Sequence, residues 1–128
     1  MKTLIIYAFF LQNIILSPNA IQNEVQIRDP FIHSVYFWLK DGTSEAEKKV
    51  FFDTLDSLRK IKGIKKLYVM TPANTPRDVV DNSYDFALII HFKNRAAQDA
   101  YQDNHIHTEA VKIMGPMIDH FIVYDANE

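Results

Sequence analysis

Apolar side chains alternate with a two-residue period in four segments of the chain, which is the pattern of β-strands. The four segments are FIHSVYFWLK (31–40), IKKLYVMTP (64–72), YDFALIIHF (84–92) and MIDHFIVYD (117–125). Between the first and second segments, and again after the third, apolar residues recur every three or four positions, which predicts helices. The predicted order of elements is therefore βαββαβ.

The first predicted helix lies within residues 41–63. Ser44 and Glu47 have the spacing of a capping box, and Gly63 is a suitable stop. We expect one buried stripe on this helix, widened by Phe52 and made of Val50, Phe51, Leu55, Leu58 and Ile61. After the third strand, Asn94 is a suitable cap for a helix, and a shorter helix is expected over residues 107–114.

The order of elements predicts an α+β fold of the ferredoxin-like type, an antiparallel four-stranded sheet with helices on one face. The other face would carry a second set of apolar residues, namely Ile32, Tyr36, Trp38, Tyr68 and Met70. Soluble monomers rarely expose an apolar surface of this size. A second copy of the chain, packed sheet to sheet about a two-fold axis, would cover it, so we expect a homodimer.

Composition removes several classes of function. The 128 residues, 48% of them apolar, suit one domain with its own core. The net charge is -2 and no basic stretch is present, which argues against nucleic acid as a partner. Because the chain has no cysteine, disulfides and thiolate nucleophiles are excluded. No glycine-rich phosphate loop occurs, so we expect no nucleotide or other cofactor.

The first 20 residues differ from the rest, since a lysine is followed by an apolar run from Leu4 to Leu16. This pattern is typical of a secretory signal peptide, with residues 21–30 as a polar lead-in to a domain at 31–126. A membrane span needs about 20 apolar residues, so no stable span is expected. The protein would then be secreted or periplasmic. The alternatives are that the segment is a retained anchor or an ordinary N-terminal element, and the prediction of a cleaved, exported protein then fails. A protein that is not exported would be cytoplasmic.

Three segments, HSVYFWLK, FFDTLDSL and YQDNHIH ahead of the strand FIVYD, resemble the stress-responsive A/B barrel family of dimeric α+β barrel proteins. The resemblance covers residues 31–125. It implies a ferredoxin-like protomer, a dimer whose sheets form a barrel, and a ligand pocket between sheet and helices. The residues expected to line this pocket are His33, Val35, Phe37, Phe51, Phe52 and Leu55.

The resemblance also makes Tyr101 and His107 candidate catalytic residues, because they match the pocket tyrosine and histidine of a plant polyketide cyclase in this family. A neutral His107 could take a proton from a carbon between two carbonyls, and the Tyr101 phenol could donate to the enolate oxygen. A helix N-terminus near His107 would favour its neutral form. The alternative is that Tyr101 only packs its ring in the core and His107 is only a polar group at the start of a helix. Leu55 stands where the cyclase has a tyrosine, so the substrate does not carry over.

Three functions therefore stay open. The first is a homodimer that binds a small apolar or carbonyl-containing ligand without turnover. The second is a cofactor-independent cyclase or isomerase, and the third is a monooxygenase-like dimeric barrel protein. A metal site is not expected, because the string His105, His107 and Glu109 would have neighbouring ligands about 200° apart on a helix.

Overall fold

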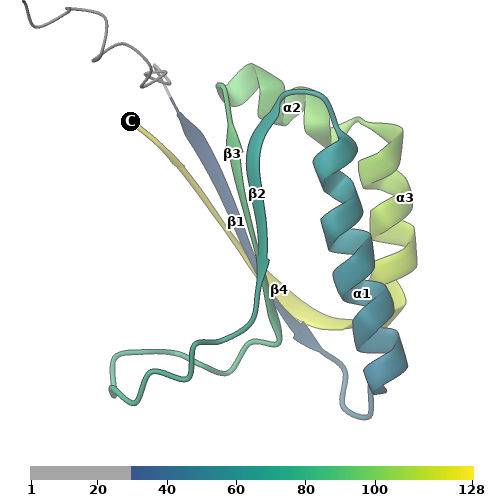
Figure 1. Ribbon diagram of the computed structural model, residues 1–128, viewed down its shortest axis with the longest axis vertical. Helices are drawn as coiled ribbons and strands as arrows, with labels where there is room; N and C mark the ends of the chain where they lie inside the picture. The colour runs from purple at the N-terminus through teal and green to yellow at the C-terminus, as the bar shows by residue number, and fades with distance from the viewer. Residues whose placement is uncertain (1–29) are drawn as a thin grey trace, which may run out of the picture.

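The computed structural model describes residues 30–128, which form a four-stranded antiparallel sheet with helices on one side (Figure 1). The strands are β1 (Phe31–Leu39), β2 (Ile64–Met70), β3 (Phe86–Phe92) and β4 (Ile118–Asn127). The helices are α1 (Glu45–Ser57), α2 (Arg95–Gln102) and α3 (His105–Met114), with short 3-10 turns η2 (Leu58–Lys60) and η3 (Gly115–Met117) after α1 and α3. The predicted signal segment, residues 1–20, and the lead-in up to residue 29 lie outside the described residues.

The strands are ordered β2-β3-β1-β4, and every neighbouring pair is antiparallel. With the βαββαβ chain order, this is the ferredoxin-like arrangement that the sequence predicts. The register sets His33 of β1 between Ile90 of β3 and Asp125 of β4. Residues directly opposite each other share a face of the sheet, so these three side chains lie on the same side.

The core lies between the sheet and the helices. Residues of β1 alternate between buried and half-buried along its whole length, as the two-residue period predicts. Phe51 and Leu55 of α1 and Ile90 and Phe92 of β3 are completely buried. Each such side chain contributes about 1.5–3 kcal/mol through removal from water. At the start of α1 the predicted capping box is present, with both of its hydrogen bonds formed.

Three predicted positions are wrong. Phe52, which we expected to widen the buried stripe of α1, is 39% exposed. Val50, which we expected in the buried stripe of α1, is 49% exposed, because Phe51 and Leu55 face the sheet and the preceding residue is turned away from them. Tyr84, which we expected within the third strand, precedes β3 and does not follow its alternation. Its ring packs on Tyr36, on the side of the sheet that no helix of residues 30–128 covers.

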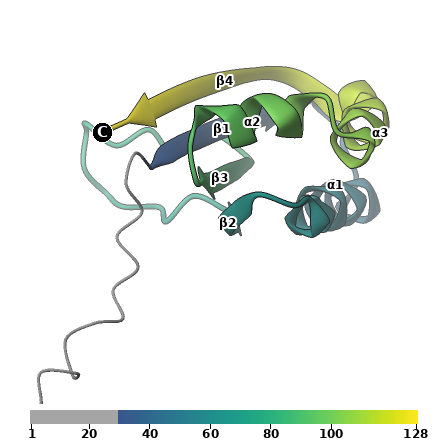
Figure 2. The ribbon, with the colours of Figure 1, turned by 90° about the horizontal axis from the view of Figure 1, so that it is seen from above.

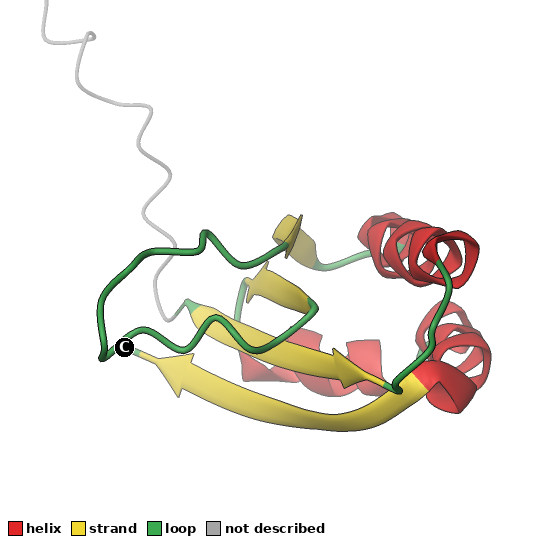
Figure 3. Cartoon of the chain, turned by 90° about the horizontal axis from the view of Figure 1, so that it is seen from below, coloured by secondary structure: helices red, strands yellow, loops and turns green. Residues whose placement is uncertain are grey.

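No helix of residues 30–128 lies over the opposite face of the sheet, which we call the outer face (Figure 2). Its apolar residues are Ile32, Tyr36, Trp38, Tyr68, Met70, Ile89, Ile122 and Tyr124. Tyr68 and Met70 are both 44% exposed, as the sequence predicts for this face. The loop between β2 and β3, residues 71–85, extends from the sheet away from the helices (Figure 3). No helix within residues 30–128 is long and apolar enough to cross a bilayer.

Candidate functional site

Tyr101 and His107 come together where α2 meets α3. The helix α2 ends at Gln102, and Asn104 begins the next helix by accepting a hydrogen bond from the backbone N–H of Ile106 at 2.9 Å. The backbone N–H of Asn104 donates to the carbonyl oxygen of Tyr101 at 3.1 Å. This tight junction leaves the ring centres of Tyr101 and His107 only 4.4 Å apart.

A cavity of about 230 Å³ lies beside these two rings, between the sheet, α1 and α3. We call it the helix-side cavity. Apart from the polar side chains, its wall includes Val35, Leu55, Val111, Met114, Phe121 and Val123. The polar side chains at the cavity are those of His33, Tyr101, Gln102 and His107. Small-molecule sites have this composition, a mostly apolar hollow with a few polar groups that orient the ligand.

His107 is held as a neutral ring. Its Nδ1 lies 3.1 Å from the carbonyl oxygen of Gln102, and because a carbonyl can only accept, Nδ1 carries the hydrogen. The pKa of His107 is lowered from its ordinary value, chiefly by burial of the ring and further by the nearby His33, while the bond to Gln102 opposes the shift. The lone pair of Nε2 is therefore available to accept a proton near neutral pH.

Tyr101 is held as an uncharged phenol. Its side chain is 2% exposed, and burial raises the pKa of its hydroxyl far above the usual range. No side-chain nitrogen or oxygen within residues 30–128 is fully buried without a hydrogen-bond partner. The Tyr101 hydroxyl has no partner in this part of the chain, so its oxygen is not fully buried. Because Tyr101 lines the cavity, this oxygen can contact a molecule there. It can donate a hydrogen bond there.

His33 is fixed by a residue that the sequence did not single out. Its Nδ1 lies 2.6 Å from a carboxylate oxygen of Asp125, directly opposite on β4. The His33 ring also meets Tyr101 edge to face, with ring centres 6.1 Å apart. Asp125 therefore sets the orientation of the His33 ring at the cavity.

The structure brings six of the predicted site residues to the helix-side cavity, namely His33, Val35, Phe37, Leu55, Tyr101 and His107. The other two predicted residues lie elsewhere. Phe51 is completely buried in the core, stacked on Phe86 with ring centres 5.5 Å apart. Phe52 lies on a different hollow, which we call the α1 groove.

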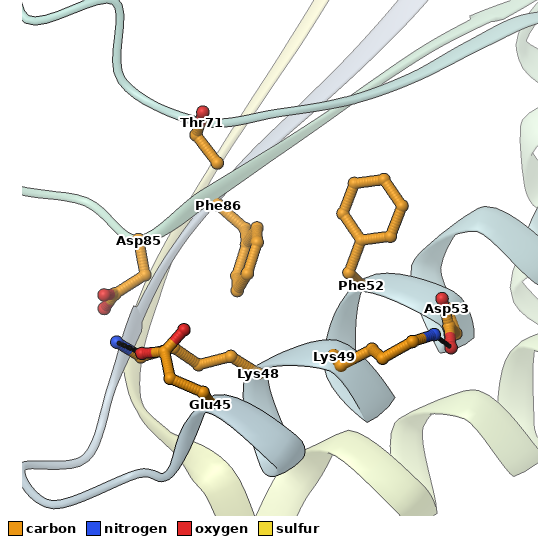
Figure 4. Close-up of a pocket in the computed structure, with 8 residues that line it drawn as sticks. All are labelled: Glu45, Lys48, Lys49, Phe52, Asp53, Thr71, Asp85 and Phe86. Carbon is orange, nitrogen blue, oxygen red and sulfur yellow. Dashed lines mark hydrogen bonds and ion pairs between the residues drawn. The ribbon is translucent and has the colours of Figure 1, made fainter.

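The α1 groove is larger than the helix-side cavity, about 590 Å³, but its chemistry is less suited to a site. Figure 4 shows the rings of Phe52 and Phe86 on its walls, with charged side chains along the rim. Two ion pairs, Lys48 with Glu45 and Lys49 with Asp53, are exposed and already satisfied, and such surface pairs contribute little. We therefore place the candidate site in the helix-side cavity.

Several cavity residues were not predicted from the sequence. Val111 and Met114 follow His107 by four and seven positions, so helical spacing alone would have placed them on the same face. Phe121 and Val123 could not be found in this way. Their place opposite β1 depends on the long-range register of β4, which no local pattern contains.

No group of three or more His, Cys, Asp or Glu side chains within residues 30–128 could hold a metal ion. The segment that contains His105, His107 and Glu109 is helical from its first residue, since α3 begins at His105. Its side chains therefore point in different directions around the helix axis.

The family model described as the stress responsive A/B barrel domain matches residues 31–128. A dimeric ferredoxin-like protein of unknown function from Thermobifida fusca is 20% identical, with a TM-score of 0.67 over 79% of this chain and 92% of that chain. A Dabb family protein from Mesorhizobium loti is 25% identical, with a TM-score of 0.64 over 77% and 96%. A hydroxynitrile lyase from Passiflora edulis is 15% identical, with a TM-score of 0.68 over 77% and 93%. No curated protein matches this chain.

Proposed function

Because this chain belongs to the stress responsive A/B barrel domain family, we propose that it is a homodimer that binds a small ligand in the helix-side cavity. The observation that carries this proposal is the convergence of His33, Tyr101 and His107 on one apolar hollow. Apolar walls and hydrogen-bonding side chains together favour a small apolar or carbonyl-containing ligand. Drug-sized ligands occupy about 300–1,000 Å³, so a cavity of about 230 Å³ favours a smaller molecule.

The dimer is supported by two observations. The outer face exposes aromatic and aliphatic side chains that no helix in the described part of the chain covers, and a second copy of the chain would bury that surface. The relative from Thermobifida fusca is described as dimeric and has the same fold. The helix-side cavity lies on the opposite side of the sheet, so dimerisation through the outer face would leave it unobstructed.

Ligand binding is tested with benzaldehyde, a small apolar molecule with one carbonyl group, titrated into the isotope-labelled full chain. We expect saturable NMR shift changes at residues of the helix-side cavity. Val111→Trp should abolish these changes by filling the cavity. The matched control is Val50→Trp, because Val50 is exposed to the same extent on α1 (49% against 50%) and does not line this cavity. Equal binding by the two variants would contradict the proposed site.

A second candidate function is cofactor-independent acid–base catalysis, which the Tyr101–His107 pair favours. Nε2 of His107 would take a proton from the substrate, and the Tyr101 hydroxyl would donate to the oxygen on which negative charge develops. Cyclases and isomerases use chemistry of this kind at carbonyl compounds. The fold neighbour from Passiflora edulis, a hydroxynitrile lyase, adds the cleavage of cyanohydrins to the reactions that merit testing.

Catalysis is tested with two probes, acetylacetone for deuterium exchange at the carbon between its carbonyls, and an aromatic cyanohydrin for release of the aldehyde. If the second function holds, the full chain accelerates at least one reaction over buffer, and His107→Ala reduces that acceleration about 10²–10⁴-fold. The control is His91→Ala, since His91 lies on the outer side of the sheet. Benzaldehyde binding without acceleration of either probe would favour the binding function over catalysis.

A further inference from the structure

The helix-side cavity has a polar end and an apolar end. Because β4 follows α3 and runs back alongside it, the start of α3 lies toward the end of β4 (Figure 1). The hydrogen-bonding side chains of the cavity gather at this end, and they are His33, Tyr101, Gln102 and His107. Toward the end of α3 and the start of β4 the wall is apolar, formed by Val111, Met114, Ile118 and Phe121.

The cavity is open on the side of β4, which is an edge strand of the sheet. Phe121 and Val123 pair with the buried residues Phe37 and Val35 of β1, so their side chains lie on the helix side. They are nevertheless 57% and 42% exposed, and Val111 of α3, on the same cavity, is 50% exposed. We call these three exposed side chains the β4 trough.

The β4 trough continues the apolar wall of the cavity into solvent. Along the strand, Val123 and Phe121 are two residues apart, which is about 7 Å. The proposed dimer does not account for their exposure, because it uses the outer face and these side chains lie on the opposite face. Exposed apolar surface that is continuous with a hollow is typical of a binding groove.

We propose that the ligand of the helix-side cavity is a carbonyl compound with an unbranched hydrocarbon chain. The carbonyl group lies at the polar end, and the chain lies in the β4 trough. This inference rests on the proposed function, since it names the chemical class that the same cavity binds. The enclosed volume of about 230 Å³ holds the carbonyl end, and the trough supplies an apolar wall for the part of the chain outside that volume.

The trough makes affinity depend on chain length. A CH₂ group that is fully removed from water improves affinity about fourfold. A chain in an open trough is covered on one side only, so each added CH₂ group should improve affinity about twofold.

The test uses 2-butanone, 2-hexanone and 2-octanone, titrated separately into the isotope-labelled full chain and followed by NMR. We expect affinity to rise about 16-fold from 2-butanone to 2-octanone, which has four more CH₂ groups. The matched ligand is 4-octanone, which has the same atoms but carries its carbonyl near the middle of the chain. It cannot place one long chain in the trough, so it should bind at least about threefold more weakly than 2-octanone.

A double variant, Phe121→Thr with Val123→Thr, locates the chain. It should still bind 2-butanone, but the gain from 2-butanone to 2-octanone should fall to about fourfold or less. The matched control is Ile122→Thr, because Ile122 is on the same strand, is 40% exposed and has its side chain on the outer face. The control should keep the full gain.

The outcomes separate this inference from the proposed function. Binding of all three ketones with equal affinity, or equal effects of the double variant and Ile122→Thr, would overturn the chain site and leave ligand binding in the cavity intact. Absence of binding by every ketone and by benzaldehyde would overturn both. If the double variant converts a dimer to a monomer in sedimentation velocity, the trough is a contact between copies and the inference is overturned.

Discussion

Tyr101 and His107 differ in how far each side chain is removed from water, and burial shifts their pKa values in opposite directions. Burial disfavours the charged form of any group, so it raises the pKa of the phenol and lowers the pKa of the imidazole. Near neutral pH the first residue is a hydrogen-bond donor and the second is a proton acceptor. The pair therefore has the protonation states that a carbonyl ligand, or acid–base chemistry, requires.

The lowered pKa of His107 predicts how stability depends on pH. The unfolded chain takes up this proton near the ordinary value of 6.5, whereas the folded chain takes it up only at lower pH. The folded state therefore loses stability as pH falls from 6.5 to the lower pKa of the folded chain. Above pH 6.5, His107 does not change the stability.

We expect His107→Gln to lose less thermal stability than the unaltered protein when pH is lowered from about 7.5 to about 5.5. The measurement is the melting temperature of both proteins across this range. Because His107 is only partly buried, the difference should be modest. Parallel pH profiles for the two proteins would contradict the assigned shift.

At the scale of elements, local signals were sufficient for most of the fold. Ser44 and Asn94 cap α1 and α2 as their sequence context predicts, because capping depends only on residues one turn away. The two-residue alternation of β1 predicts which of its side chains face the helices and which face away, because this pattern also depends only on neighbouring residues. The contribution of β4 to the cavity could not be predicted. Phe121 and Val123 join it through strand pairing with a segment more than 80 residues earlier in the chain.

The adjacent residues Phe51 and Phe52 show how local reasoning fails within one helix. Both were predicted to line the pocket, but Phe51 is completely buried and Phe52 is 39% exposed. We expect Phe51→Ala to lower the free energy of unfolding by about 3–5 kcal/mol, because it leaves a void against Phe86 and Phe37. Phe52→Ala should cost about 1 kcal/mol. Urea denaturation of the two variants measures both values, and similar losses would contradict this packing.

At the scale of the whole molecule, the sheet separates two surfaces with different chemistry. The helix side encloses a small apolar cavity with two histidines and a tyrosine, and the outer side exposes aromatic and aliphatic residues. Within residues 30–128, no helix of the protomer covers the outer side (Figure 2). This division is the physical basis for expecting one side to bind a ligand and the other to contact a second copy.

The proposed dimer makes a direct prediction for the molecular mass in solution. Sedimentation velocity of the full chain at micromolar concentration should give twice the protomer mass. Met70→Glu, which places a charge on the outer face, should shift the protein to monomer. Val50→Glu places the same charge on the exposed side of α1 and should remain dimeric. A monomeric unaltered protein, or equal behaviour of the two variants, would contradict the dimer.

Occupancy of the helix-side cavity is tested most directly by a crystal structure of the protein with 4-bromobenzaldehyde, in which anomalous scattering locates the bromine atom. We expect one dominant bromine position between β1, β4 and α3, with the carbonyl oxygen within hydrogen-bond reach of the Tyr101 hydroxyl. Bromine found only in the α1 groove or on the outer face, with the helix-side cavity empty at saturating concentration, would contradict ligand binding at this site.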